Sequence, residues 1–191
     1  ASLFDSLWMG LLGAALVGWL HGDGFVGQYT KGSNRSLTIE FITVNQEEFR
    51  YVLDRVQRVF PDVHSHVRSV DAENPDLDIK RVRLYGESLR PFIDKYALLD
   101  GQDEREIPDA VLREGKAAQA AYLRSLFQAD GTVRLRNRKT RTADVELTST
   151  SGNLVKGVQT LLLNQGLYSR TQRCVDRRIN RRAAYQLSLG Y

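Results

Sequence analysis

Cysteine and histidine are scarce in this chain of 191 residues, which contains the single cysteine Cys174 and the three histidines His21, His64 and His66. A lone cysteine cannot form an internal disulfide, and its isolation fits a reducing compartment. A cysteine-rich zinc site is excluded, and three scattered histidines are too few for a convincing zinc cluster. We therefore expect an intracellular, cytoplasmic protein stabilised by neither disulfides nor zinc.

Long apolar runs are also lacking. Residues 3–20 form the most apolar stretch, but it contains Asp5 and three glycines. It is shorter and more broken than the roughly 20 apolar residues that a membrane-spanning helix requires. It has neither a basic flank nor a convincing cleavage site. We expect a buried core helix here and no membrane partner.

Positive charge is rare in most of the chain and concentrated near its end. Residues 1–130 contain 15 Lys and Arg against 20 Asp and Glu, whereas residues 131–191 contain 12 against 3. The formal net charge of +4 therefore conceals a strongly basic C-terminal third. A basic block of this density favours a polyanionic partner, with nucleic acid first. The alternative is a solvated basic face.

An internal repeat organises the sequence. Residues 16–24 and 123–131 share the order Leu, any, small, apolar, apolar, polar, small, Asp, Gly, which places Asp23 and Asp130 107 positions apart. Downstream, the Ile-Glu-Phe at 39–41 recurs as Val-Glu-Leu at 145–147, with an offset of 106. Two similar halves are the simplest explanation of matched motifs at a nearly constant offset.

Each half has the same expected order of elements, helix, hairpin, helix, hairpin. Apolar residues at helical spacing predict amphipathic helices over 47–60 and 153–163, and a short helix over 89–98. Strand-like runs occupy 64–70, 79–85, 169–175 and 183–189. The segment 100–106 is acidic and lacks apolar residues, so it predicts an exposed linker, and Pro108 is expected to open a short helical segment. This predicts an α+β fold with a first half at 1–99, a linker and short helix at 100–115, and a second half at 116–191.

The repeated helix has small residues at every fourth position, which lie on one face of a helix. A face of small side chains allows the close approach of a second helix. We expect the two helices to pack on each other about a pseudo-twofold axis, although each could instead pack beneath its own sheet. The expected interface residues are Ala14, Gly18, Gly22, Ala121, Ser125 and Ala129.

The Asp-Gly pairs are expected to end both helices, with Gly24 and Gly131 as left-handed caps. Carboxylates are unfavourable at helix C-termini, and two paired helices would add repulsion between Asp23 and Asp130. A divalent cation bound by oxygen would offset both costs, and Mg²⁺ suits a site with few protein ligands. Backbone carbonyls of the preceding residues, Gly22 and Ala129, are candidate further ligands. The alternative reading takes each Asp-Gly as a hairpin turn signal.

These two segments resemble the LAGLIDADG motif of homing endonucleases. The first departs from the consensus at Trp19 and His21, and the second at Ser125, Phe127 and Gln128, but the terminal Asp-Gly is intact in both. The stretch 107–131 is particularly similar to endonuclease domains found inside inteins. The similarity extends over nearly the whole chain through the repeat arrangement.

The resemblance implies a monomer with two pseudosymmetric αββαββα halves, whose antiparallel sheets form a saddle over double-stranded DNA around a central pair of motif helices. It implies a site-specific endonuclease in which Asp23 and Asp130 bind two or three Mg²⁺ ions and cut both strands across the minor groove. Mn²⁺ or Ca²⁺ could substitute in binding, and no protein partner is implied. A bacterial, archaeal or phage mobile element, with an intein as the first guess, is the expected origin. Lys80 is a possible assisting lysine that no motif fixes.

Alternation along the strands assigns candidate DNA contacts. Arginine on a β-ribbon suits guanine in the major groove. Expected strand contacts are Gln28, Thr38, Glu40, His66, Arg68, Arg81, Arg83, Arg134, Arg136, Arg138, Arg170, Gln172 and Gln186. In this scheme Val82, Leu84, Val133 and Leu135 lie on the opposite faces. Expected phosphate contacts in loops are Lys31, Asn34, Arg35, Lys139, Arg141, Arg177, Arg178, Arg181 and Arg182.

Two other functions are compatible with parts of the sequence. A non-catalytic nucleic-acid binder on the same fold, such as an intron RNA maturase or a transcription regulator, would have no evident need for two metal-binding aspartates. A structural or protein-interaction domain would explain the small-residue face but not the arginine-bearing strands. Because the halves differ in sequence, an endonuclease should have a long, asymmetric target.

Overall fold

The computed structural model describes residues 3–28, 36–70, 77–100, 104–137, 142–174 and 183–190. Its first half contains α1 (Leu3–Asp23), β1 (Gly24–Gln28), β2 (Leu37–Thr43), α2 (Gln46–Val59), β3 (His66–Ser69), β4 (Lys80–Tyr85), the 3-10 turn η1 (Glu87–Leu89) and α3 (Arg90–Lys95). Next come α4 (Asp109–Arg113), α5 (Lys116–Asp130), β5 (Gly131–Asn137), β6 (Thr142–Ser149), α6 (Gly152–Asn164), β7 (Arg170–Cys174) and β8 (Ala184–Gly190).

This order confirms the expected α+β fold of two similar halves. The amphipathic runs form α2 and α6 to within a residue, and the four later strand-like runs form β3, β4, β7 and β8. Pro108 directly precedes α4 as its N-cap. Within the described residues, α3 has no counterpart after β8, so the seventh element is found in the first half alone. The proposed boundaries at 99/100 and 115/116 stay a prediction.

Local capping explains where the amphipathic helices begin. The Asn45 side chain accepts a hydrogen bond from the Glu48 N–H (2.9 Å), and the Glu48 carboxylate accepts one from the Val44 N–H (3.0 Å). Ser151 caps α6 in the same way through the Leu154 N–H (3.1 Å). Each cap satisfies a backbone donor that the first helical turn leaves unpaired. The two helices therefore begin at equivalent places in the halves.

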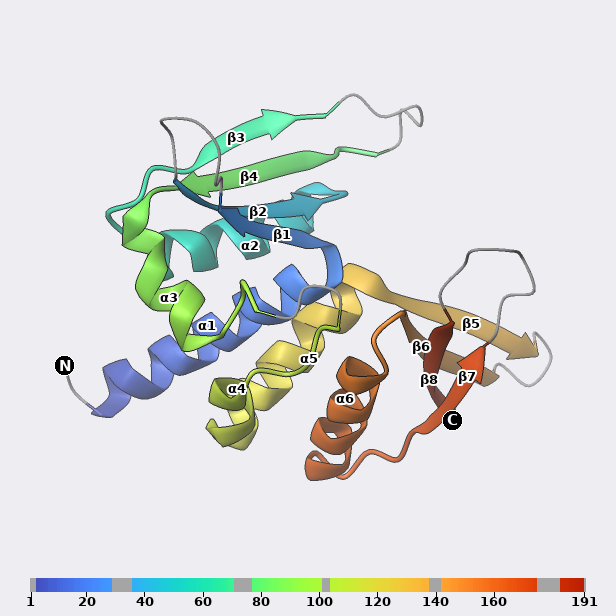
Figure 1. Cartoon of the computed structure of the whole chain (residues 1–191). Helices are drawn as coiled ribbons and strands as arrows, with labels where there is room; N and C mark the ends of the chain where they lie inside the picture. Colours follow the sequence, from blue (N-terminus) through green and yellow to red (C-terminus); the bar gives the residue numbers. More distant parts are fainter. Residues whose placement is uncertain are drawn as a thin grey trace.

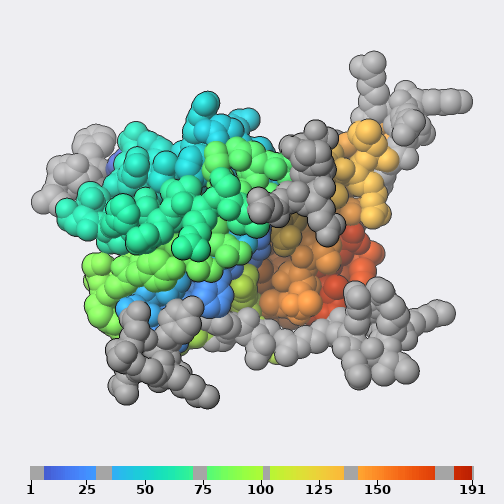
Figure 2. All heavy atoms as spheres, turned by 90° about the horizontal axis from the view of Figure 1, so that it is seen from above, coloured from blue at the N-terminus to red at the C-terminus, as the bar shows by residue number. Residues whose placement is uncertain are grey.

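Each half builds one antiparallel sheet of four strands, in the orders β1-β2-β4-β3 and β5-β6-β8-β7. In the first sheet Ile39 and Phe41 of β2, and Val82 and Leu84 of β4, are fully buried on the helix side. The intervening residues, which include Arg83, lie on the opposite, open face. Figure 1 shows each sheet with its own helix, α2 or α6, and the pair α1 and α5 between the halves. Seen from above, the two halves lie side by side (Figure 2).

The central pair, α1 and α5, packs along the small-residue face that the sequence predicts. A Cβ added at Gly18 would lie 2.2 Å from the Tyr122 carbonyl oxygen, and one at Gly22 would lie 2.6 Å from the Ala129 Cβ. Ser125 is fully buried at this contact. The two helix backbones are therefore so close that a larger side chain at Gly18 or Gly22 would clash with α5. Among the described residues, no helix is both long enough and apolar enough to cross a membrane, and α1 is a core helix.

The edge strand β5 departs from simple alternation. Val133 and Leu135 do lie on the face opposite Arg134, but they are 68% and 66% exposed. Figure 1 shows β5 running outward from the body of the second half, away from α6. The pairing of β5 with β6 also shifts between Leu135 and Asn137, so the two-residue period does not carry through to Arg136. The side chain of Arg136 and the whole of Arg138 lie outside the described residues, so the expectation of one arginine face along this strand stays a prediction.

Candidate metal centre and nucleic-acid interface

The C-terminal ends of α1 and α5 meet at the boundary between the halves. Asp23 and Asp130 are the last residues of the two helices, and each directly precedes the first strand of its sheet. The packing of Gly22 on Ala129 continues to the end of the pair, because a Cβ at Gly22 would also lie 3.4 Å from the Asp130 Cβ. The fold thus brings together the two aspartates that the repeat singled out.

The glycine after each aspartate has a different role from the one expected. Gly131 is extended (φ −81°, ψ 151°), and Gly24 is not among the residues with positive φ. The expectation of left-handed caps was therefore wrong. A Cβ at Gly131 would lie 2.3 Å from the Phe127 carbonyl oxygen, and one at Gly24 would lie 2.6 Å from the Leu20 Cα. Glycine is required because each strand leaves its helix by passing directly over the last turn.

Burial and mutual repulsion make both carboxylates harder to ionise. Burial raises the pKa of Asp130, and the negative charge of Asp23 raises it further. Burial also raises the pKa of Asp23, with an added contribution from the Glu48 carboxylate. Both side chains end helices, where the dipole disfavours negative charge. The site accumulates negative charge that a cation would stabilise.

The linker contributes a cation that the sequence did not reveal. Arg105 donates from Nη1 to the His21 carbonyl oxygen (2.8 Å), near the C-terminal end of α1, and its charge lowers the pKa of Asp130. Its own carbonyl oxygen accepts a hydrogen bond from the Ser151 hydroxyl, which caps α6. Arg105 therefore joins the end of α1 to the second half through its side chain and its main chain. No periodicity or motif marks such a residue.

Two of the motif departures, His21 and Gln128, make different contacts across the interface. His21 Nδ1 lies 2.8 Å from the Tyr122 hydroxyl, and burial lowers the pKa of His21 to about 4. Gln128 donates from Nε2 to the Glu48 Oε1 atom (3.1 Å), so that it binds the residue that caps α2. Glu48 is a buried carboxylate that the sequence reading passed over. These positions link the halves by hydrogen bonds that differ from one side to the other.

The donor set at the helix ends fits a hard divalent cation. Asp23 and Asp130 offer carboxylate oxygens, and the carbonyls of Gly22 and Ala129 lie one residue before them. Among the described residues, no group of three or more His, Cys, Asp or Glu side chains could enclose a metal ion. A site with two carboxylates leaves most positions to water and to ligand oxygens, which is how Mg²⁺ is commonly bound. Lys80 contacts Asp78 (3.0 Å) and Gln46 (2.6 Å), and its role as an assisting lysine stays a prediction.

The open face of the first sheet carries its basic residues in register. Across β2, β4 and β3, Glu40 lies opposite Arg83, which lies opposite His66, and Arg81 lies opposite Arg68. His66, Arg68, Arg81, Arg83 and Tyr85 line a hollow of about 230 Å³. The ring of His66 packs edge-on against Tyr85 at 5.5 Å. This face has the donors and the shape for an anionic or hydrogen-bond-accepting ligand.

The second sheet carries a different set at matched positions. Gln186 lies opposite Gln172 and donates to the Glu146 carboxylate (2.8 Å), while its own oxygen accepts from the Gln172 amide (2.7 Å). Arg134 is 3.6 Å from the same carboxylate. Arg170 is exposed on β7. The second sheet therefore has the amides of Gln186 and Gln172 beside its own arginines.

The expected DNA contacts are unequally accessible. Gln28, His66, Arg68, Arg134, Arg170 and Gln172 are exposed, whereas Thr38 is 3% and Glu40 is 6% exposed. Glu40 is covered by ion pairs with Arg81 and Arg83. The Arg136 side chain is not described, and ten further candidates lie wholly outside the described residues: Lys31, Asn34, Arg35, Arg138, Lys139, Arg141, Arg177, Arg178, Arg181 and Arg182. All of these contacts stay predictions.

Residues 117–190, which include α5 and the whole second sheet, match the family model of the LAGLIDADG-like domain. The second half of the chain is therefore similar to this family. The match covers the second motif, whose departures at Ser125, Phe127 and Gln128 leave Asp130 and Gly131 intact.

Solved structures share the fold of this chain. The homing endonuclease I-DmoI in complex with DNA and Mn has a TM-score of 0.67 and 16% identity, over 95% of this chain and 90% of that chain. I-WcaI bound to its DNA recognition sequence gives 0.62 and 14%, over 94% and 75%. The N-terminal LAGLIDADG domain of WhiA gives 0.60 and 13%, over 96% and 76%. At these identities the likeness establishes the fold.

Two curated proteins match part of the chain. The ribonucleoside-diphosphate reductase NrdEB subunit alpha of Bacillus subtilis, and its namesake in Bacillus phage SPbeta, are each 32% identical over 117 residues. The matched region is 60% of this chain but only 10% of each relative. The chain thus corresponds to about a tenth of the length of these relatives.

Proposed function

We propose that the chain is a site-specific endonuclease that hydrolyses phosphodiester bonds on both strands of a long, asymmetric DNA target, across the minor groove. The observation that carries this proposal is the meeting of Asp23 and Asp130, one from each half, at the ends of two packed helices. The open sheet faces on either side carry arginine and glutamine. Structures of I-DmoI and I-WcaI with DNA support the assignment.

In this proposal Asp23 and Asp130, with the carbonyls of Gly22 and Ala129, hold two or three Mg²⁺ ions, for which Mn²⁺ or Ca²⁺ can substitute in binding. When bound, the ions supply activated water and stabilise the leaving oxygen of an in-line displacement. The close helix packing sets the separation of the carboxylates, and Arg105 anchors the end of α1. Each sheet binds one half-site, so a single chain reads an asymmetric sequence and acts as a monomer.

The partial match to a much longer reductase subunit supports an origin as an endonuclease encoded within another protein's gene, as in an intein. In such a setting the chain acts in the cytoplasm, where it meets the genome. An endonuclease of this kind needs a target long enough to occur rarely. Two sheets that read different bases meet that need.

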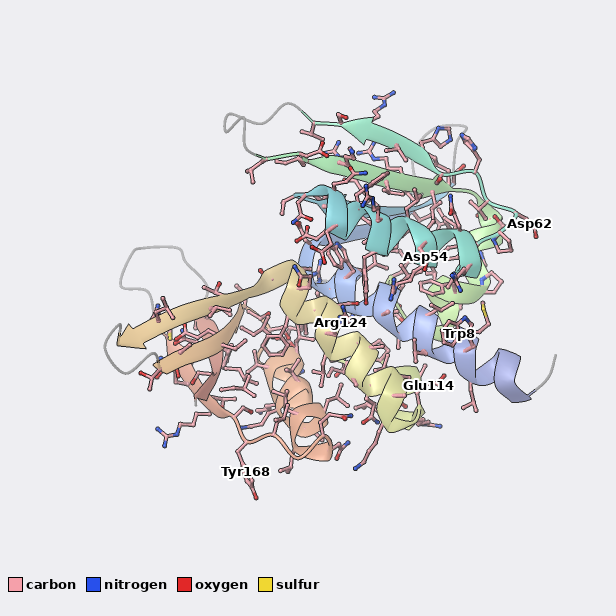
Figure 3. All side chains as sticks on the ribbon, turned by 180° about the vertical axis from the view of Figure 1, so that it is seen from behind. Trp8, Asp54, Asp62, Glu114, Arg124 and Tyr168 are labelled. Atoms are coloured by element: carbon pink, nitrogen blue, oxygen red, sulfur yellow. The ribbon has the colours of Figure 1, made fainter. Side chains whose placement is uncertain are left out.

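The test is cleavage of a randomised duplex library with Mg²⁺, first by the wild type and then by Asp23→Asn and Asp130→Asn. We expect double-strand cleavage by the wild type alone, with DNA binding largely kept in both variants, because asparagine preserves shape but removes ligand charge. Asp62→Asn is the matched control, since this exposed aspartate lies at the far end of the first half from the helix ends (Figure 3).

Retained double-strand cutting by either active-site variant in Mg²⁺ would refute the assignment of the metal ligands. A wild type that binds a defined duplex but leaves it intact would instead support a non-catalytic DNA binder on this fold. An RNA maturase would prefer structured RNA to duplex DNA in a competition assay. The three functions therefore give three distinct results.

A further inference from the structure

Glu40 has an unusual position for a residue on a DNA-facing surface, because it is a buried carboxylate beneath two arginines. It is 6% exposed, and its two oxygens point to different partners. Oε1 lies 3.1 Å from Nε of Arg81, and Oε2 accepts a hydrogen bond from Nε of Arg83. A carboxylate placed among phosphate-binding groups would weaken DNA binding. Its presence there calls for a role other than affinity.

The contacts of Glu40 leave the outer edge of each guanidinium group available. An arginine loses substantial side-chain entropy when it is held in one orientation. Because Glu40 accepts a hydrogen bond from Nε of Arg83 and forms an ion pair with Arg81, part of that entropy is lost before DNA binds. Nη1 of Arg83 also donates to the Tyr85 hydroxyl at a long 3.5 Å. The terminal Nη groups face the hollow, where they can form the two-pronged contact that arginine makes with O6 and N7 of guanine. The arginines of this face are oriented before DNA arrives.

The hollow lined by these arginines fits the edge of a base. It measures about 230 Å³, with Arg68 and His66 on β3 and Tyr85 on β4 completing its wall. All five lining side chains offer hydrogen-bond donors, and guanine is the base with two acceptors and no donor on its major-groove edge. Adenine and cytosine each present an amino group there, from which the three arginines cannot accept a hydrogen bond. The lining therefore discriminates in favour of guanine.

The second sheet keeps the glutamate and changes its partner. Glu146 occupies the position of Glu40, since Phe41 pairs with Gly24 as Leu147 pairs with Gly131. The register then matches Gln186 to Arg81 and Gln172 to Arg68. Glu146 accepts a hydrogen bond from the amide of Gln186, the residue matched to Arg81, and its other partner is Arg134 of β5 (3.6 Å). The two halves thus have a glutamate at the same position of the sheet, but the side chains that it orients differ.

We propose that Arg81 and Arg83, oriented by the buried Glu40, read guanine in the half-site bound by the first sheet, and that the second sheet, with Gln186 at the matched position, lacks this requirement. The proposal rests on the DNA binding proposed above but not on cleavage. Arg81 and Arg83 are specificity-determining residues here. Glu40 is a positioning residue that acts through them.

The experiment selects bound duplexes from a randomised library in Ca²⁺, so that base preference is measured whether or not the protein cuts. We expect guanine at one position on one side of the centre in the wild type. Arg81→Gln should reduce the preference there by about 5- to 150-fold, the range for losing a two-pronged contact, and leave other positions unchanged. Arg50→Gln, on the exposed face of α2, is the matched control and should change neither preference nor affinity.

Glu40→Gln tests whether Glu40 orients the arginines, because the substitution should raise the affinity for DNA while it lowers the preference for guanine. Removal of a negative charge from the interface should increase binding to DNA of any sequence and steepen its salt dependence. Loss of the orienting carboxylate should weaken the guanine preference in the same variant. A merely structural role for Glu40 would lower both together.

Gln186→Arg provides the gain-of-function arm, because Glu146 is already placed to hold the new side chain. It should create a guanine preference on the other side of the centre. If Arg81→Gln instead weakens binding evenly across all sequences and lowers the salt dependence, the arginines contact phosphate and the proposal is overturned. Selection of no sequence by the wild type would remove the proposed function as well, whereas cleavage without guanine at this position would remove only the inference.

Discussion

The packing of α1 on α5 makes a sharp prediction for Gly18→Ala. The new Cβ would lie 2.2 Å from the Tyr122 carbonyl oxygen and 3.1 Å from the Ser125 Cβ, well inside normal contact distance. The obstacle is helix backbone, so the helices themselves must separate. Overpacking of this kind costs about 1–3 kcal/mol or more, while alanine regains up to about 1 kcal/mol of helix propensity. We expect a net loss of about 1–2 kcal/mol.

Gly10→Ala is the matched control in the same helix. Its Cβ would meet only the Glu114 carboxylate, at 2.7 Å, and that side chain is flexible and half-buried. The propensity gain should survive there, so that stability is unchanged or raised by up to about 1 kcal/mol. For a chain of this size about 1 kcal/mol moves the Tm by about 2–4 °C. Thermal unfolding followed by circular dichroism should place Gly18→Ala below the wild type and Gly10→Ala at or above it.

The same pair of variants tests whether helix packing sets the geometry of the site. Since Asp23 lies one and a half turns beyond Gly18, separating the helices there would move it relative to Asp130. DNA cleavage, measured well below either Tm, should fall in Gly18→Ala and persist in Gly10→Ala. Equal unfolding temperatures for the two variants, within about 2 °C, would refute the packing argument.

Three further predictions follow from the site. Folding raises the pKa of the Asp130 carboxyl, so this carboxyl makes the fold less stable as pH rises above its unfolded value of 3.8. Without metal, Asp130→Asn should therefore stabilise the fold at neutral pH. In urea unfolding, Ca²⁺ at about 100 times its Kd should add about 2.7 kcal/mol to the stability of the wild type, but little to that of the Asp23→Asn, Asp130→Asn double variant. His21 has a folded pKa of about 4 against 6.5 unfolded, so the wild type should lose stability as pH falls below 6.5, by at most about 1.4 kcal/mol per pH unit, and His21→Gln should remove that dependence in urea titrations at pH 7.5 and 5. Glu48→Ala leaves the Val44 N–H and the Gln128 amide unpaired and should lower the free energy of unfolding by about 2–3 kcal/mol. The control Glu47→Ala, at an exposed position, should lower it by less than about 0.5 kcal/mol. Equal losses in the two variants would show that the capping carboxylate adds nothing.

Local pattern was enough to predict the central helices and their meeting ends. Small residues four positions apart lie on one face of a helix, which predicts the face on which the two helices pack. The Asp-Gly pairs recur at the same position of the repeat, so Asp23 and Asp130 could be identified from the sequence. The role of Gly131 could not be predicted in the same way. Glycine permits both a left-handed cap and a close crossing, and only the path of β5 shows which applies.

Contacts between distant segments were beyond the reach of the sequence. Gln128 and Glu48 are 80 residues apart, and His21 and Arg105 are 84 apart, so no spacing rule connects them. The 68% exposure of Val133 could not be predicted from periodicity either. Alternation predicts which face of a strand a side chain takes, but not whether another element covers that face.

The unlike contacts at the helix interface restrict how this protein could be recombined with its relatives. A chimera that joined the first half to a foreign second half would give His21 a partner other than Tyr122 and would leave Glu48 without Gln128. Successful exchange therefore requires both residues of each pair to be kept together. These hydrogen-bonded pairs restrict the design of new specificities by exchange of halves, whereas substitutions on the face of one sheet leave them unchanged.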